Sequence, residues 1–338
     1  MALTSRPGVG RLYRSSNLHC LRASSVQVTC LAPSDRPLVR EAGWLWKQSS
    51  TSDTQAYLRT QKTRPKKSLG QNFVVNDELL AAIVREAHIQ PGDVVFEIGP
   101  GTGNLTRYLL QAGAEVTAIE KDDTLAAGLA QACAQEPKFT MVHADVLALD
   151  LQAVIAACLA QKQHTRARSR KVKIIANLPY YITKDCLRQV LPLGDSVSLV
   201  YLMLQEEAAQ RLVVEGPGTP HYRAMNVFVN FYSLPRYEFR VDKSSYHPQP
   251  SVDGALVRFR LLPQAERLPM SAEATFWRMV DQAFAERRKM LRNSLQSLYE
   301  GALVTATLQR IGLPDTARAQ DLSVAQFVAL FQNLTSQT

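Results

Sequence analysis

The sequence predicts an α/β protein with a Rossmann-like, mostly parallel sheet, an antiparallel sheet edge and a small all-α C-terminal domain. Two observations support this fold class. Short β-branched runs alternate with segments of helical periodicity between residues 94 and 204, which is typical of βαβ units with right-handed crossovers. After Pro263 the remaining apolar segments have helical periodicity, and no strand pattern separates them.

The alternating elements follow one another at regular spacing. Asn76 or Asp77 can cap a helix whose apolar positions recur up to Ile89, where a Pro-Gly-Asp turn ends it. Strands are expected at residues 94–99, 114–120, 139–145, 171–179 and 197–204. Helices are expected after the first three strands and after the last one, at residues 104–112, 121–136, 151–163 and 205–214.

The chain changes character after the Gly- and Pro-rich loop "EGPGTPHY". Residues 225–233 and 254–262 are predicted to be strands joined without a helix, which indicates an antiparallel pair at the sheet edge. Residues 274–299 and 324–334 are predicted to be helical. We therefore expect a main domain at residues 61–262 and a helical domain at residues 263–338.

Composition narrows the class of protein. Hydrophobic residues make up 46% of the 338 residues. No stretch approaches the roughly 18 consecutive apolar residues that a membrane span needs, so we expect no membrane partner. The formal net charge of +9 and the pI near 9.4 favour a polyanionic partner such as nucleic acid.

Residues 1–60 are predicted to be a transit peptide or disordered leader. Asp35 is the first acidic residue, whereas Arg and Ser recur before it, a composition typical of organelle transit peptides. The rest of the chain has 31 basic against 27 acidic residues, a net charge of +4. The expected destination is the chloroplast, with the mitochondrion as the alternative.

The five cysteines indicate neither a metal site nor a disulfide framework. Cys20, Cys30, Cys133, Cys158 and Cys186 form no Cys-x-x-Cys pair. They are expected to be small apolar side chains in a reducing compartment, and no metal is expected.

Three strand ends carry residues suited to a nucleotide-like ligand. The turn "EIGPGTGN" places Gly99, Gly101 and Gly103 between a strand and a helix, where backbone can approach a ligand closely. Glu120 ends the next strand, in position to accept hydrogen bonds from ribose hydroxyls. Asp145 ends the third strand and can accept a hydrogen bond from an adenine amino group. These features fit NAD and S-adenosylmethionine equally.

The fourth strand separates these two ligands. Asn177, Leu178, Pro179 and Tyr180 provide an amide oxygen, a backbone carbonyl outside the strand ladder and an aromatic ring. Two acceptors can hold the hydrogens of an exocyclic amine and orient its lone pair, while a base stacks on the ring. A nicotinamide enzyme has no evident use for this arrangement, so methyl transfer is favoured over hydride transfer.

A family resemblance supports the same reaction. "NLPY" occurs with "SLGQNFVVND", "EIGPGTGNLT", "AIEKD", "HADVL" and "YHPQPSVDG" in a chain order that resembles the ribosomal RNA adenine N6-dimethyltransferases, across about residues 61–300. The plastid branch is the most similar. The resemblance implies a class I methyltransferase fold, S-adenosyl-L-methionine as cofactor, and dimethylation of two adjacent adenines near the 3′ end of small-subunit rRNA during ribosome biogenesis.

The resemblance also implies roles for individual residues. Asn72 and Val74 would contact the methionine part of the cofactor, as would the glycine turn. Glu120 would hold the ribose, and Asp145 the adenine of the cofactor. The implied cofactor-binding set is Asn72, Val74, Gly99, Gly101, Gly103, Glu120, Asp145 and Asn177. Val74 stands where the family usually has Leu.

The implied catalytic set is Asn177, Leu178, Pro179, Tyr180 and Tyr246. Asn177 would contact both the cofactor and the target amine, and Tyr180 would stack on the target base. Tyr246 stands where the family often has Phe. Direct in-line transfer needs mainly proximity and alignment, worth up to roughly 7–11 kcal/mol in favourable cases. No strong general base is evident.

Two basic segments are candidate RNA contacts. Lys66 and Lys67 precede the cofactor motif, and Arg287, Arg288, Lys289 and Arg292 are expected on a helix of the second domain, opposite its apolar side. The expected partner is small-subunit rRNA or a precursor of the small subunit, and the expected state is a monomer.

Two other functions remain open from the sequence. One is DNA adenine N6-methylation, which uses base flipping and a similar tetrapeptide. The other is a non-catalytic assembly or transcription factor on the same fold. The intact Glu120, Asp145 and "NLPY" favour an active enzyme.

Overall fold

The structure is a computed structural model of the chain. It describes residues 49–161, 171–213 and 216–336, together with the backbone of three short strands before residue 32. The described chain divides into two compact units. Unit 1 comprises Met1–Glu206 and Glu238–Phe259, and unit 2 comprises Glu207–Tyr237 and Arg260–Thr338. Most of the expected leader lies outside the described residues.

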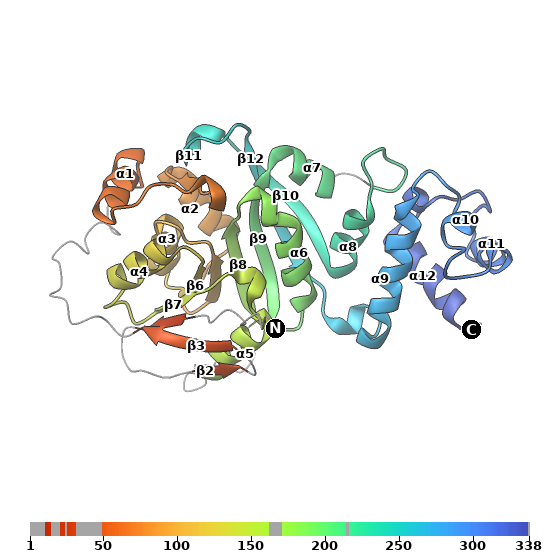
Figure 1. The fold of residues 1–338 in the computed structure, drawn as a ribbon, viewed down its shortest axis with the longest axis horizontal. Helices are drawn as coiled ribbons and strands as arrows, with labels where there is room; N and C mark the ends of the chain where they lie inside the picture. Colours follow the sequence, from red (N-terminus) through yellow and green to blue (C-terminus); the bar gives the residue numbers. More distant parts are fainter. Residues whose placement is uncertain are drawn as a thin grey trace, which may run out of the picture. The chain divides into compact units, whose positions relative to one another are not determined.

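A mostly parallel sheet organises unit 1, as predicted (Figure 1). Its strand order is β10-β12-β9-β8-β5-β6-β7-β1-β3-β2. Parallel ladders join β5 (Val94–Ile98), β6 (Glu115–Glu120), β7 (Phe139–His143), β8 (Val172–Asn177) and β9 (Val197–Gln205). Outside them lie β12 (Gly254–Leu261) and β10 (Ser233–Val241) at one edge, and β1 (Arg11–Arg14), β3 (Val26–Leu31) and β2 (Leu21–Ala23) at the other.

Strand β5 marks the point where the chain changes direction across the sheet. It pairs with β6 on one side and with β8 on the other, so the carboxyl ends of strands from both halves meet beside it. All five of its residues are buried, as expected for a strand covered on both faces. In open α/β sheets, ligands bind in the crevice at such a switch point.

The helices of unit 1 pack on this sheet. Figure 1 shows α3 and α4 beside β6 and β7, and α2 packs against α3. Asn76 Oδ1 accepts from the backbone N of Leu79 at 3.0 Å and caps α2, as predicted. The helices are α2 (Asp77–Glu86), α3 (Asn104–Gln111), α4 (Asp123–Ala132), α5 (Leu151–Gln161) and α6 (Thr183–Val190). The last of these was not expected from the sequence.

Helix α1 (Thr51–Thr60) lies inside the segment expected to be leader. Tyr57 and Leu58 are 3% and 4% exposed and form a cluster with Phe73 and Leu125. Ser49 anchors the start of this segment: its backbone N donates to Asp77 at 3.0 Å, and its Oγ accepts from Arg107 at 2.7 Å. Residues 49–60 are therefore packed into unit 1.

Unit 2 is helical, which confirms the prediction of a helical C-terminal region. Figure 1 shows α9 to α12 in blue. Aromatic rings fill its interior; Phe231 and Phe276, for example, are stacked with centroids 5.1 Å apart. Its helices are α7 (Glu206–Val213, from its second residue), α8 (Ala224–Tyr232), α9 (Met270–Ala285), α10 (Leu291–Ser294), α11 (Gly301–Arg310) and α12 (Val324–Thr335).

The strand expected at residues 225–233 is wrong, because this segment forms α8. Its run of apolar residues has neither strand nor helix periodicity, so the pattern could not decide between them. Asn226 settles the local structure: its Oδ1 accepts from the backbone N of Arg223 at 3.0 Å and its Nδ2 donates to the carbonyl of Arg211 at 2.6 Å. The strand begins only at Ser233.

The long helix expected at residues 274–299 is also interrupted. Helix α9 ends at Ala285, and α10 begins at Leu291. Between them Met290 forms a β-bridge with Arg318, and the backbone N of Leu291 donates to the carbonyl of Ala317 at 2.9 Å. This pairing, together with the complete burial of Leu291, outweighs the helical propensity of the segment.

A buried carboxyl group lies on β5. Glu97 is 2% exposed, and its Oε2 accepts from Thr106 Oγ1 at 2.6 Å. Burial raises the pKa of Glu97 to about 8; the nearby Glu120 acts in the same direction, and the Thr106 hydrogen bond opposes it. Glu97 is therefore protonated at neutral pH.

The packing of α1 predicts where truncation becomes harmful. Deletion of residues 1–60 should lower the free energy of unfolding by several kcal/mol relative to deletion of residues 1–48, because only the longer deletion removes Tyr57 and Leu58 and burial of each large apolar side chain contributes about 1.5–3 kcal/mol. Urea unfolding of the two truncated proteins measures the difference. Equal stabilities would show that α1 contributes nothing to unit 1.

The state of Glu97 predicts a pH dependence of stability. In the unfolded chain this carboxyl group has its ordinary pKa of 4.5 and loses its proton there, whereas the folded chain keeps the proton up to about pH 8. Stability should therefore fall as pH rises through this window, by up to about 1.4 kcal/mol for each pH unit.

Glu97→Gln keeps an acceptor for Thr106 but cannot ionise. The fall in stability with rising pH that Glu97 causes should therefore be absent in this variant. Urea unfolding of both proteins across the window measures it, and parallel pH profiles would contradict the assignment.

Candidate active site

A pocket opens at the carboxyl ends of the parallel strands of unit 1. Its lining comes from the loop before α2, the carboxyl ends of β5 to β8 with the residues that follow them, Met203 of β9 (Val197–Gln205), and Tyr246. Of the residues implied for cofactor binding and catalysis, it brings together Asn72, Val74, Gly99, Gly101, Glu120, Asp145, Asn177, Leu178, Pro179, Tyr180 and Tyr246. Gly103 is not in the lining and instead forms the N-cap of α3.

The glycine turn requires left-handed backbone. Gly99, Gly101 and Gly103 have φ values of +70°, +58° and +83°, a region that side chains with a Cβ rarely adopt. Space is limiting at Gly101 as well, because a Cβ there would lie 2.8 Å from the ring of Phe73. The turn thus brings the backbone and the start of α3 to the pocket floor without side chains in the way.

Glu120 presents a buried carboxyl group at the end of β6. It is 7% exposed, and it accepts from the backbone N of Asp122 at 2.8 Å and of Gly101 at 3.1 Å. Burial raises its pKa, and these two hydrogen bonds oppose the rise. Both of its oxygens are held in place while retaining lone pairs for a further donor.

Asp145 follows β7 and caps a short turn. Its Oδ1 accepts from the backbone N of Leu147 at 3.0 Å, and its Oδ2 pairs with the Lys121 ammonium at 2.8 Å. The hydrogen bond from Lys121 to Asp145 is the main cause of a raised pKa for Lys121. Asp145 is thus an oriented acceptor beside the buried Val146.

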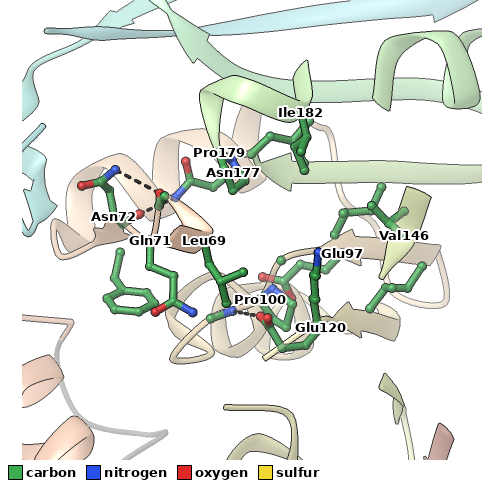
Figure 2. A pocket seen from close by; sticks show the side chains of 18 of the residues that line it. Leu69, Gln71, Asn72, Glu97, Pro100, Glu120, Val146, Asn177, Pro179 and Ile182 are labelled. Atoms are coloured by element: carbon green, nitrogen blue, oxygen red, sulfur yellow. Dashed lines mark hydrogen bonds between the residues drawn. The ribbon is translucent and has the colours of Figure 1, made fainter. Parts of the chain in front are cut away.

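The orientation of the Asn177 amide is fixed by one hydrogen bond. Its Nδ2 donates to the backbone carbonyl of Asn72 at 2.9 Å, and Asn72 Nδ2 donates to the carbonyl of Gly70 at 3.2 Å. Figure 2 shows Asn72 and Asn177 close together, with Glu120 farther along the pocket beside Pro100. Since its nitrogen is engaged, Asn177 offers its Oδ1 as an acceptor to the pocket.

Two tyrosines add aromatic surface. Tyr180 is partly buried, and burial raises its pKa. Tyr246 is 5% exposed, with its hydroxyl 3.6 Å from the Met203 sulfur. Burial raises the pKa of Tyr246 as well, so both side chains are neutral phenols at pH 7.

The loop over the pocket is held by contacts that the sequence did not reveal. Asp122 caps α4 and is 2% exposed; although burial opposes ionisation, hydrogen bonds from Lys66 and Gln71 lower its pKa. Lys66 Nζ lies 2.8 Å and Gln71 Nε2 3.0 Å from its Oδ2. Lys66, expected to contact RNA, is therefore engaged by a carboxylate of unit 1.

A short strand pairing also holds the same loop. β4 (Phe73–Val74) pairs antiparallel with β11 (Tyr246–His247), which brings Val74 opposite Tyr246. The Val74 carbonyl accepts from Asn104 Nδ2 at 2.7 Å. The pairing places Tyr246 at the pocket although it lies far along the chain, and no spacing in the sequence indicated this contact.

The basic residues expected to contact RNA differ in their surroundings. Lys67 and Arg288 are exposed, whereas Lys289 pairs with Glu286 and Arg292 with Asp315. Of the four residues expected on one helix of the second domain, only Arg292 lies on a helix, so the expected continuous basic helix is wrong.

Arg287 belongs to an arginine cluster that the sequence did not reveal. Its Nη1 and the Nη1 of Arg223 both donate to the Pro220 carbonyl, at 2.5 and 2.7 Å. Burial lowers the pKa of Arg223, and the charges on Arg287 and Arg211 lower it further. Like charges therefore gather on this part of unit 2.

The described residues contain neither a helix that could span a membrane nor a cluster of metal-ligating side chains. Within that part of the chain, no helix is both long and apolar enough to cross a bilayer. Nor do three or more His, Cys, Asp or Glu side chains gather there in a way that could hold a metal ion. Cys133, Cys158 and Cys186 are buried free thiols.

Known proteins are similar to this chain in sequence and in fold. A chloroplastic ribosomal RNA small subunit methyltransferase of Arabidopsis thaliana is 37% identical over 286 residues, covering 84% of this chain and 83% of the relative. Ribosomal RNA small subunit methyltransferase A of Protochlamydia amoebophila is 35% identical and covers 84% and 96%. A dimethyladenosine transferase structure from Plasmodium falciparum has a TM-score of 0.63 at 20% identity, covering 78% and 97%, and supports the fold.

The family model described as "Ribosomal RNA adenine dimethylase" matches residues 62–336, which include the whole pocket and the helices of the C-terminal region. The match extends well beyond half of the chain. With the glycine turn, Glu120, Asp145 and Asn177 gathered at one sheet edge, the chain belongs to the ribosomal RNA adenine dimethylase family.

Proposed function

We propose that this protein transfers methyl groups from S-adenosyl-L-methionine to the N6 atoms of two adjacent adenines near the 3′ end of small-subunit rRNA. The observation that carries the proposal is the orientation of Asn177, whose nitrogen is bound to Asn72 and whose oxygen is left for the pocket. An oxygen that accepts hydrogen bonds beside the Tyr180 ring suits the exocyclic amine of an adenine.

The pocket residues fit the cofactor by their chemistry. Glu120 offers a fixed carboxylate to a ribose diol, and Asp145 offers an acceptor to an adenine amine. The glycine turn leaves room for the methionine part near Asn72 and Val74. When bound, the cofactor supplies an electrophilic methyl group on a sulfonium.

The chain's own contribution is orientation. Asn177 Oδ1 and the Leu178 carbonyl accept the two amine hydrogens of the target, which directs the nitrogen lone pair at the methyl group. Tyr180 stacks on the target base, and Pro179 ends the strand so that the Leu178 carbonyl is presented. After transfer the methylated nitrogen carries an additional proton, which it loses to water; Glu97 is not assigned as the acceptor, because burial raises its pKa.

RNA contacts outside the pocket are assigned to exposed cations. Lys67, Arg288 and the pair Arg287 and Arg223 are proposed to bind backbone phosphates. Lys66, Lys289 and Arg292 already have carboxylate partners, so their roles in RNA binding are secondary.

We also propose that the protein acts in an organelle, with the chloroplast as the first choice. The support is the acid-poor leader and the chloroplastic relative at 37% identity. The packing of α1 favours a leader that ends before Ser49 rather than at residue 60.

The ribose assignment predicts a loss of cofactor affinity in Glu120→Gln. Affinity measured by calorimetry should fall by roughly 10- to 100-fold, because hydrogen bonds to a charged acceptor contribute about 1.5–3 kcal/mol. Glu115→Gln, at the opposite end of the same strand, is the matched control and should bind normally. Unchanged affinity in Glu120→Gln would exclude a ribose contact.

The amine clamp predicts a catalytic defect in Asn177→Ala. The turnover number on small-subunit particles should fall by at least about 100-fold, because the target amine loses its alignment. The melting temperature should stay close to wild type, and Asn333→Ala on α12 should behave normally in both assays. Primer extension across the 3′ end of the rRNA measures dimethylation, and near-normal turnover would contradict the clamp.

A further inference from the structure

Two large apolar side chains at the pocket are exposed to solvent. Tyr181 is 60% and Leu147 37% exposed, and both belong to the lining. Glu120 and Tyr246, which line the same pocket, are only 7% and 5% exposed. Tyr181 therefore lies at the entrance of the pocket rather than inside it, and nothing in the proposed methyl transfer uses its ring.

The position of the Tyr181 ring is constrained by its backbone. It is the middle residue of the turn η4 (Tyr180–Ile182), which is closed by a hydrogen bond from the Ile182 N to the Pro179 carbonyl at 3.2 Å. Tyr181 is thus the residue immediately after Asn177–Tyr180, the segment proposed to hold the target adenine, and it lies in a short, hydrogen-bonded turn. The turn thus fixes the backbone position from which the Tyr181 side chain extends at the entrance.

Gly70 leaves space for the ring. A Cβ on Gly70 would lie 3.4 Å from Tyr181 Cε1 and 3.0 Å from Pro179 Cβ. Gly70 of the loop over the pocket therefore lies beside the ring, and Tyr181 is 60% exposed to solvent. An exposed aromatic ring at the mouth of a pocket is a stacking surface for a base.

We propose that Tyr181 stacks on the base adjacent to the target adenine. This inference rests on the proposed function, because an adenine that enters the pocket from an RNA chain leaves its neighbours at the entrance. Base stacking on an exposed aromatic ring is tolerant of sequence and is common in single-strand recognition. In a pair of adjacent adenines, Tyr181 holds one adenine while Tyr180 and Asn177 hold the other.

The cofactor's own adenine is the competing occupant of this surface. The groups assigned to it, Asp145 and Val146, lie in the same pocket, and Tyr181 is close enough to Lys121, the partner of Asp145, to make a minor contribution to the raised pKa of Lys121. The exposure of Tyr181 favours the RNA base, since Glu120 and Val146, two residues assigned to the cofactor, are 7% and 5% exposed. Substitution of Tyr181 distinguishes the two occupants, because it should lower kcat/KM if the ring holds the RNA base and cofactor affinity if it holds the cofactor's adenine.

The test uses the full chain and small-subunit particles reconstituted with rRNA that carries, next to the target adenine, either its natural base or an abasic ribose. Tyr181→Ala should lower kcat/KM on natural particles by roughly 5- to 150-fold, the range of base–aromatic stacking. Tyr181→Phe should remain within about twofold of wild type, since stacking does not need the hydroxyl. Met270→Ala, an exposed apolar side chain outside the pocket lining, is the control.

The abasic substrate tests the contact itself. It should slow the wild-type enzyme about as much as Tyr181→Ala does, and it should slow Tyr181→Ala no further, because both changes remove the same interaction. Cofactor affinity measured by calorimetry should be equal in wild type and Tyr181→Ala.

Three results would overturn the inference: normal kcat/KM in Tyr181→Ala, losses that add, or a matching loss of cofactor affinity, which would assign the ring to the cofactor. A wild-type enzyme that methylates no particle would instead refute the proposed function, and the inference would fall with it.

Discussion

The site depends on the parallel pairing of β5 with β6 and β8. In parallel ladders, successive strands end at the same sheet edge, so the turn after Ile98, the carboxyl group of Glu120 and the amide of Asn177 come together although they are far apart in sequence. Because every residue of β5 is buried, its register is fixed by packing, and a slip would turn Glu97 and its neighbours to the wrong face. The chemistry thus relies on groups whose places are set by the core.

A second level of organisation connects the pocket to the loop above it. Asp122 binds Lys66 and Gln71, while Asn177 binds the backbone of Asn72. The loop is therefore joined both to the side that would hold the ribose and to the side that would hold the target amine.

Much of unit 1 could be predicted because its signals are local. Glycines at Gly99 and Gly113, the cap at Asn76 and β-branched runs such as residues 94–98 determine the elements, and the strand ends then locate the pocket. The errors arise where distant contacts decide. Residues 224–232 form a helix because of Asn226 and its surroundings, α9 stops because Leu291 pairs with Ala317, and α1 was hidden by the composition of the segment before it. The ion pair of Lys66 with Asp122 likewise could not be seen from either residue alone.

The pairing of β4 with β11 has a consequence for how the protein is made. Phe73 and Val74 emerge early in synthesis, whereas Tyr246 and His247 emerge only after β9 and the first part of unit 2. The ends of β5 to β8 can assemble before then, but the wall that Tyr246 contributes is missing. The pocket is consequently one of the last parts of unit 1 to form, and a nascent chain that stops before residue 246 would carry the acidic groups for a ligand without the enclosure that retains it.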